Sequence, residues 1–456
     1  MLGTVEMPVW ALVIVVLFAA VTALTHVIGP SVRWFFRKRA ERVVARVNEK
    51  LTRPIEPFKL ARRHDMIQRL CYDEKVINAV ADYAASEKVP EQVAFEKAQS
   101  YAREIVPSFS ATAYFGIGTR VAKFLANALY RVRLGHVDAD ALRQIGPEAT
   151  VVFIMNHRSN MDYVLVTYLA ARASALSYAV GEWARVWPLS RLIRSMGAYF
   201  IRRKSRGELY RRVLARYVQL ATAGGVTQAV FPEGGLSLDG RTAPPKLGLL
   251  SYIVDDFDPE GRDVVFVPVA LNYDRVLEDR VLIAAGEEGT RRFRAKISVV
   301  AGFTLRQLWL RITGRFYRFG YASVSFGKPL SLAAFQTEHG TDAVDALGQE
   351  MMERINQVMP VLPVPLVATV LLRHAEPISQ QQIEQEVQAI LTNMQSAHVH
   401  LPRGDVSYAV EVGVRALVAR KICQQDGAGI AVADAEKAAA QYYANSIERV
   451  ISAHAV

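Results

Sequence analysis

The stretch TVVFIMNHRSNMDYVLVTYLA, residues 150–170, decides the fold of this chain. Its first six residues form an apolar and β-branched run that predicts a buried strand, because short apolar runs are typical of strands covered on both faces. Residues 156–160 are rich in polar, cap-forming side chains, and apolar residues at helical spacing begin at Met161. A strand, a polar turn and a helix in this order indicate an α/β protein.

The polar turn places His157 five residues before Asp162. In a continuous α-helix these side chains would lie roughly 140° apart around the axis, so they meet only if His157 lies in the turn and Asp162 in the first turn of the helix. A carboxylate that accepts from one ring nitrogen leaves the other nitrogen able to take a proton from a hydroxyl. We therefore predict His157 as a general base oriented by Asp162; a capped helix with a solvent-exposed histidine is the alternative.

Further apolar runs alternate with helical stretches between about residues 146 and 330. The expected strands are 150–155, 199–201, 228–231, 264–271 and 321–326. We expect a mixed sheet covered by helices, with the site at the strand ends, where α/β folds usually place ligands. Residues 73–133 have a helical pattern and precede this sheet.

The N-terminal segment Val9–Ile28 is mostly apolar and about 20 residues long, which is enough to cross ~30 Å of hydrocarbon as a helix. The cations that follow it are Arg33, Arg37, Lys38, Arg39, Arg42 and Arg46. Because positive charges favour the cytoplasmic side, we expect a single-pass anchor with the rest of the chain on the cytoplasmic face of the cell membrane, the inner membrane if the source is a bacterium. Membrane phospholipid is accordingly an expected partner.

Composition narrows the class of protein. The chain has 456 residues, a net charge of +11 and 51% hydrophobic residues, which suits anionic partners. No zinc-finger, RNP-like or recognition-helix signature accompanies the charge, so we do not expect nucleic acid. With only two cysteines a disulfide framework is not expected, and the HxH pair His398 and His400 has no convincing further ligands for a metal. The oligomeric state is left open.

Three more blocks follow the HRSNMD turn in a fixed order. They are GAYFIRR at 197–203, FPEGG at 231–235 and VPVALNY at 267–273. Together with PPKLGLL at 244–250, the ordered blocks resemble the glycerolipid acyltransferase family, and within it the glycerol-3-phosphate and dihydroxyacetone-phosphate acyltransferase branch. The resemblance runs from about residue 79 to the end.

This resemblance implies a direct acyl transfer. His157 would deprotonate the sn-1 hydroxyl of glycerol 3-phosphate, Asp162 would orient His157, and the oxygen would attack the thioester of acyl-CoA or acyl-ACP. The product would be lysophosphatidic acid, and no cofactor beyond these co-substrates is expected. Phosphate recognition requires cations, and the expected acceptor-binding residues are Arg158, Arg202, Arg203, Glu233, Gly234, Arg241 and Lys246.

One departure from the family's pattern concerns the residues after Gly235. The family usually carries basic residues there, whereas this chain has Leu236 and Leu238. The leucines leave another acceptor open, such as lysophosphatidic acid or dihydroxyacetone phosphate. A separate alternative is a catalytically silent membrane scaffold that binds lipid, but the presence of His157, Asp162 and Glu233 argues against it.

The resemblance and the apolar N-terminus together predict four regions. We expect a transmembrane anchor at 1–32, a basic juxtamembrane segment with a helical domain at 33–140, an acyltransferase catalytic domain at 141–335 and a C-terminal helical region at 336–456.

Overall fold

The computed structural model describes residues 7–24, 29–171, 173–181, 185, 187, 189–202, 207–289, 319–341, 343–394 and 399–454. The chain forms two compact units, Met1–Pro54 (unit 1) and Ile55–Val456 (unit 2).

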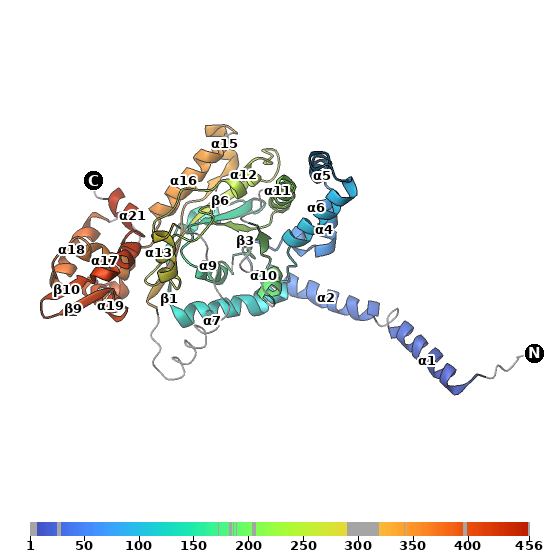
Figure 1. Ribbon diagram of the computed structural model, residues 1–456, viewed down its shortest axis with the longest axis horizontal. Helices are drawn as coiled ribbons and strands as arrows, with labels where there is room; N and C mark the ends of the chain where they lie inside the picture. Colours follow the sequence, from blue (N-terminus) through green and yellow to red (C-terminus); the bar gives the residue numbers. More distant parts are fainter. Residues whose placement is uncertain are drawn as a thin grey trace, which may run out of the picture. The chain divides into compact units, whose positions relative to one another are not determined.

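Unit 1 contains the helices α1 (Val9–Ala23) and α2 (Gly29–Asn48) (Figure 1). The side chains of α1 are exposed along nearly its whole length. In the part of the chain that the structure describes, no helix combines the length and the apolarity needed to span a bilayer. The predicted span 9–28 includes residues 25–28, which lie outside the described residues.

Unit 2 begins with a helical layer, as the sequence predicts. Its helices are α3 (Pro57–Leu60), α4 (Arg63–Cys71), α5 (Glu74–Glu87), α6 (Glu91–Ile105), the π-helical turn η2 (Thr112–Gly118) and α7 (Thr119–Leu129). Asp73 caps α5 by accepting from the backbone N–H of Lys75. The predicted helical stretch 73–133 ends slightly earlier than expected. Arg131–Val137 forms a strand at one edge of the sheet and pairs with the strand Tyr321–Phe326.

The central sheet contains eight strands. They are β1 (Arg131–Val137), β2 (Thr150–Met155), β3 (Ser177–Gly181), β4 (Tyr199–Ile201), β5 (Gln228–Val230), β6 (Val264–Tyr273), β7 (Tyr321–Phe326) and β8 (Leu330–Ser331). Their order is β1-β7-β6-β2-β5-β3-β4, with β8 pairing with β6. All five predicted strands are confirmed, and β1, β3 and β8 are additional.

The sheet is mixed, as expected. Among β2, β3, β4, β5 and β6, strands that pair are parallel, whereas β7 and β8 run antiparallel to β6, and β1 runs parallel to β7. Strand β2 lies between β5 and β6, and all six of its residues are buried. This central position explains the continuous apolar run, because a parallel strand covered on both faces has no solvent side.

Helices cover both faces of the sheet. The remaining helices around it are α8 (Ala139–Arg143), α9 (Met161–Ala170), α10 (Leu189–Ser195), α11 (Glu208–Ala223), α12 (Gly248–Val254), α13 (Asp279–Glu287), α15 (Leu332–His339) and α16 (Val344–Gln357). In Figure 1, α7 and α9 lie on one side of the sheet, and α11, α12 and α16 lie on the other. The expected helix-covered α/β architecture is therefore confirmed.

The C-terminal part of unit 2 is mostly helical, with one hairpin. It contains α17 (Pro363–Leu371), α18 (Gln380–Asn393), η4 (Pro402–Gly404), α19 (Val406–Ala419), β9 (Cys423–Asp426), β10 (Gly429–Val432), η5 (Asp434–Glu436), α20 (Lys437–Ala444) and α21 (Glu448–Ala453). Helix α17 is buried along almost its whole length and packs against α19 and α20.

Helix α20 contacts the loop that follows the FPEGG block. The side chain of Asn445 donates to the carbonyl oxygen of Asp239 at 2.7 Å. Gly240 has a φ of +91°, and a Cβ placed on it would lie 1.9 Å from the carbonyl oxygen of Tyr442. The loop and α20 can approach this closely only because residue 240 has no side chain.

We predict that Gly240→Ala destabilises the protein by roughly 3 kcal/mol, because the added methyl group must push α20 away and also strains the backbone. Gly289→Ala is the matched control: Gly289 has a φ of +63°, and no atom of the described residues lies within 4 Å of its Cβ position. Its cost should be about 1 kcal/mol, from the backbone alone. Urea unfolding followed by circular dichroism measures both, and equal costs would contradict the packing argument.

Candidate active site

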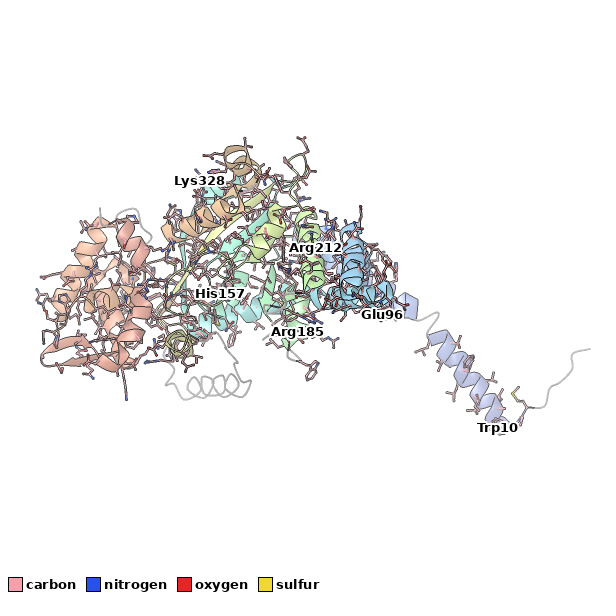
Figure 2. The ribbon with its side chains drawn as sticks, turned by 45° about the horizontal axis from the view of Figure 1, so that its top comes forward. Trp10, Glu96, His157, Arg185, Arg212 and Lys328 are labelled. Carbon is pink, nitrogen blue, oxygen red and sulfur yellow. The ribbon has the colours of Figure 1, made fainter. Side chains whose placement is uncertain are left out.

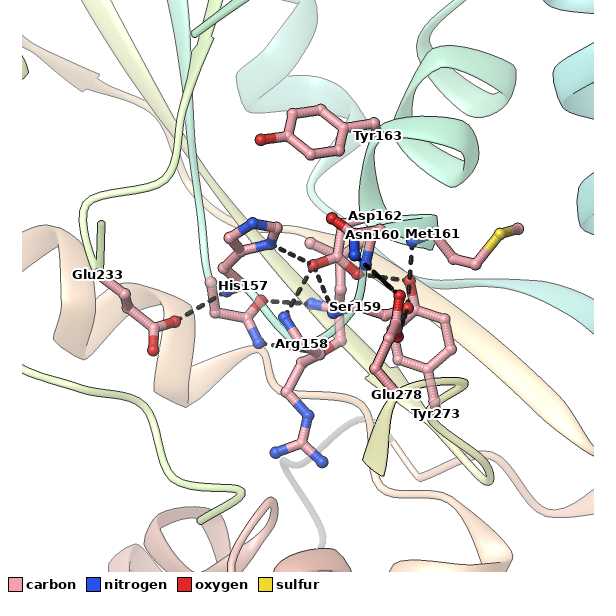
Figure 3. A network of polar contacts seen from close by, with 12 residues as sticks. His157, Arg158, Ser159, Asn160, Met161, Asp162, Tyr163, Glu233, Tyr273 and Glu278 are labelled. Carbon is pink, nitrogen blue, oxygen red and sulfur yellow. Dashed lines mark hydrogen bonds and ion pairs between the residues drawn. The ribbon is translucent and has the colours of Figure 1, made fainter. Parts of the chain in front are cut away.

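The polar turn between β2 and α9 brings His157 and Asp162 together (Figure 3). The Nδ1 of His157 lies 2.9 Å from Oδ2 of Asp162, and both side chains are buried. As the sequence predicts, His157 lies in the turn and Asp162 lies in the first turn of α9. The solvent-exposed histidine of the alternative explanation is therefore wrong.

Asp162 accepts four hydrogen bonds. Besides His157, its Oδ2 accepts from the backbone N–H groups of Arg158 at 2.8 Å and Ser159 at 3.0 Å. Its Oδ1 accepts from the hydroxyl of Tyr273 at 2.5 Å. Donors on both oxygens hold the carboxylate in one orientation. The same bonds fold residues 157–159 back toward α9.

The ring of His157 is fixed in place on several sides. It stacks near the ring of Phe231, with centroids 4.1 Å apart, and meets the edge of Tyr163 at 5.6 Å. Because a charged carboxylate only accepts, Nδ1 carries the hydrogen, and the lone pair is on Nε2. Within the described part of the chain, Nε2 has no hydrogen-bond partner. The geometry leaves this nitrogen available as a base.

Glu233 holds the backbone beside the histidine. Its Oε1 accepts from the N–H of His157 at 2.8 Å, and its Oε2 accepts from the N–H of Ala243 at 3.0 Å. The side chain is 2% exposed. Burial raises the pKa of this carboxyl to about 7. Both oxygens of Glu233 therefore bind backbone and join the HRSNMD turn to the loop after FPEGG.

Two further side chains fix the turn, and neither was predicted from the sequence. Glu278 accepts from the hydroxyl of Ser159 at 2.8 Å and from the side chain of Asn160 at 3.0 Å. Asn156 forms a reciprocal pair with the backbone of Leu271, at 2.9 and 2.7 Å, which ties the end of β2 to β6. Tyr273, which donates to Asp162, is the last residue of the VPVALNY block, so the sequence pattern could have identified it. No motif in the sequence marks Glu278.

The predicted phosphate-binding residue Arg158 is buried next to His157. Its Nη1 donates to the carbonyl oxygen of Gly240, and its guanidinium lies 4.9 Å from the ring centre of Tyr442. The remaining Nε and Nη2 are buried and, among the described residues, have no hydrogen-bond partner. Arg158 therefore connects the turn to α20 and keeps two unused donor groups.

Arg202 lies away from His157. It forms a two-pronged pair with Glu104, with Nε at 2.9 Å from Oε1 and Nη2 at 2.5 Å from Oε2. Glu104 raises its pKa. Strand β4 is three strand steps from β2, which is roughly 14 Å at the usual spacing. The structure does not bring Arg202 to the turn, and Arg203 lies outside the described residues.

The last two predicted cations differ in position. Arg241 is half exposed and pairs with Glu448 at 2.7 Å. Lys246 lies against Gly234, because a Cβ on that glycine would be 2.8 Å from Cδ of Lys246 and 3.2 Å from its Nζ. Lys246 is thus the predicted cation that the structure places beside the segment holding Glu233.

The two leucines that replace the expected cations have a structural role. Leu236 and Leu238 are partly buried and pack against the main core. No group of three or more His, Cys, Asp or Glu side chains in the described residues is arranged to hold a metal ion. His398, one half of the HxH pair, lies outside those residues.

Comparison with known proteins finds relatives over both halves of unit 2. A family described as "Acyltransferase" matches residues 136–272, which contain the turn and Glu233. A family described as "Glycerol-3-phosphate acyltransferase C-terminal region" matches residues 307–456.

The curated relatives are named glycerol-3-phosphate acyltransferase. Glycerol-3-phosphate acyltransferase from Pseudomonas entomophila is 28% identical over 76% of this chain and 44% of its own length. The protein of that name from Shewanella amazonensis is 29% identical over 87% of this chain and 51% of its own length. The chain thus spans about half the length of the curated relatives it matches. The resemblance to the glycerolipid acyltransferases is confirmed.

A solved structure is also similar in part. It is the 1-acyl-sn-glycerophosphate acyltransferase from Thermotoga maritima, 19% identical, covering 53% of this chain and 77% of that chain with a TM-score of 0.32.

We predict that stability falls as pH rises from about 4.5 to 7, because the folded protein holds protons on Glu233 and Asp274 that the unfolded chain has already released. Burial raises the pKa of each from its ordinary value, 4.5 or 3.8, to about 7. Glu233→Gln should flatten this slope in part. Melting temperatures between pH 4.5 and 8 measure it.

Asp274→Asn is the matched control for this slope. Asp274 accepts from the backbone of Tyr321 and Val364, outside the turn. We expect it to flatten the slope by a similar share. An unchanged slope in both variants would contradict the burial argument.

Proposed function

We propose that this chain, a relative of the glycerol-3-phosphate acyltransferases, transfers a fatty acyl group from acyl-CoA or acyl-ACP to the sn-1 hydroxyl of glycerol 3-phosphate. The product is lysophosphatidic acid. The observation that carries the proposal is the buried His157–Asp162 pair, which has a ring nitrogen available and lies inside the acyltransferase match. The names of the curated relatives support the choice of acceptor.

His157 is the base in this reaction. Its Nε2 takes the proton of the acceptor hydroxyl while the hydroxyl oxygen forms a bond to the thioester carbonyl carbon. The C–S bond then breaks, and the leaving thiolate takes the proton back from His157. The ester and a free thiol are the products, so no acyl-enzyme and no nucleophilic serine or cysteine are needed.

Asp162 stabilises the charged histidine during the transfer. Three donors besides His157 hold the carboxylate in one orientation, so it is already in place beside the ring when the imidazolium forms. Tyr273 is the only side chain among these three donors and acts as a positioning residue. Glu233 acts in the same way on the backbone of His157.

Lys246 and Arg158 are our candidates for the acceptor phosphate. Lys246 lies beside Gly234, and Arg158 retains two buried donor groups. Charge-assisted hydrogen bonds from such groups are about twice as strong as neutral ones. Arg202, Arg203 and Arg241 stay predictions, because the first and last are already paired with glutamates.

Membrane attachment is a further part of the proposal. The apolar sequence of residues 9–28, the exposed side chains of α1 and the cations that follow support an anchor, with the site on the cytoplasmic face. Phospholipid is then the surrounding partner, and the product enters it directly.

We predict that His157→Ala lowers turnover by about 10² to 10⁴, the usual contribution of a general base. The assay is acyl transfer from a long-chain acyl-CoA, and separately from acyl-ACP, by detergent-solubilised protein. Glycerol 3-phosphate, dihydroxyacetone phosphate and lysophosphatidic acid are offered as rival acceptors. Turnover only on another acceptor would reassign the substrate, and wild-type activity in the variant would favour the lipid-binding scaffold.

We predict that Tyr273→Phe lowers kcat roughly tenfold and leaves KM unchanged, because it removes one hydrogen bond to the charged Asp162 without opening a cavity. Tyr130→Phe is the matched control. Tyr130 is also buried, packs 5.4 Å from the Tyr273 ring and donates instead to the carbonyl of Arg275. Equal losses in kcat would show a general effect of packing and would refute the positioning role.

A further inference from the structure

Two short helical segments of unit 2 expose large apolar side chains. On η2 and α7 these are Ile117, Val121, Phe124 and Leu125, and on α10 they are Leu189 and Leu192. Trp187, just before α10, is 79% exposed. We call these seven residues the α7–α10 surface. Isolated exposed apolar residues are ordinary, but a contiguous group on one surface marks an interaction site.

The two segments adjoin one another. A Cβ on Gly118, at the end of η2, would lie 2.2 Å from the sulfur of Met196, which follows α10. The N–H of Ser110, just before η2, donates to the carbonyl oxygen of Ser195 at 2.9 Å. Figure 1 shows α10 beside the N-terminal end of α7. The exposed side chains therefore belong to one region of the surface.

Helix α7 buries small side chains and exposes large apolar ones. Its small residues Ala122 and Ala126 are buried, whereas Phe124 is 61% exposed. A helix that merely covers a core turns its large apolar side chains inward. Here the alanines allow close packing on α9, and the large side chains face outward. Ordinary core packing thus does not explain the choice of residues.

Charge accompanies the apolar side chains. From Ile105 to Val137 the sequence has no aspartate or glutamate, but it has Arg120, Lys123, Arg131 and Arg133. From residue 183 to 207 it again has no acidic residue, and its cations include Arg191 and Arg185, the second of which pairs with Glu104 at 2.6 Å. Figure 2 shows Arg185 at the margin of unit 2. Arg120, Lys123 and Arg191 are exposed among the apolar side chains.

We propose that the α7–α10 surface docks on an anionic phospholipid bilayer. Phe124 and Trp187 enter the boundary between headgroups and acyl chains, where aromatic side chains are favoured. The neighbouring cations lie among the anionic headgroups and keep their aliphatic stems on the apolar side. This contact belongs to unit 2 and is separate from the apolar N-terminal segment. It does not rest on the proposed acyl transfer.

Docking at this surface would place the bilayer near the site. Helix α7 packs against α9, whose first turn carries Asp162. The docked face is therefore one helix away from the helix that orients His157. A fatty acyl chain or a lipid product could pass between bilayer and site over a short path.

The test uses the full chain with an NBD fluorophore on a single introduced cysteine. Cys71 and Cys423 are buried and do not compete for the label. Val121→Cys places the label on α7, and Val281→Cys places it on α13 as the matched control, since the two valines are 47% and 52% exposed. The vesicles contain phosphatidylcholine and phosphatidylglycerol at about 3:1, with or without brominated chains, and sedimentation measures binding by any route.

We expect vesicles to shift the emission at residue 121 to the blue and to raise its intensity at least about twofold, with quenching by brominated chains. The label at residue 281 should not respond. Pure phosphatidylcholine, or Arg120→Glu with Lys123→Glu, should weaken the response at 121 severalfold. A label at Arg120→Cys repeats the test if Val121→Cys fails to fold.

Several results would overturn the proposal. In the first, the protein sediments with vesicles while the emission of the label at residue 121 stays as it is in solution. That result would show that the protein attaches to the vesicles through another surface. A label that is already blue-shifted without vesicles shows that other protein segments or a second copy cover the surface. Failure of the full chain to bind, or an equal response on neutral vesicles, would also contradict docking on anionic lipid.

Discussion

The structure of the site depends on one carboxylate. Asp162 accepts from the ring of His157, from two backbone N–H groups of the same turn and from Tyr273 on β6. These bonds determine the conformation of the turn and the tautomer of the histidine together. They also join the adjacent strands β2 and β6, so the position of His157 follows from the pairing of the sheet as well as from the turn.

A second set of contacts extends this arrangement to the rest of unit 2. Glu233 connects the turn to the loop after FPEGG, and that loop is held by α20 from the C-terminal part. Arg158 also connects the turn to this loop and to α20, through its contacts with Gly240 and Tyr442. The HRSNMD turn, the FPEGG loop and α20 therefore form one connected structure, although they come from residues far apart in the sequence.

Local features of this protein could be predicted from the sequence, and distant ones could not. The strands β2, β4, β5, β6 and β7 are short apolar runs between helical stretches, and the His157–Asp162 contact needs only one turn. Strand β1 was missed because Arg131–Val137 carries alternating cations directly after a helix, and only its pairing with β7 makes it a strand. Glu278 is far in sequence from Ser159, and Glu104 is far in sequence from Arg202. Only the tertiary fold brings each of these pairs together, so the sequence could not predict them.

The buried guanidinium of Arg158 has a consequence for the modularity of the protein. It is covered by Tyr442, more than a hundred residues beyond the last strand of the sheet. A protein cut after the sheet would expose this cation and remove the contacts of α20 with the loop at Gly240, so we expect the part that carries His157 to be less stable without the C-terminal part. For the same reason, a substitution in α20 that alters Tyr442 would change the surroundings of Arg158, the residue next to His157.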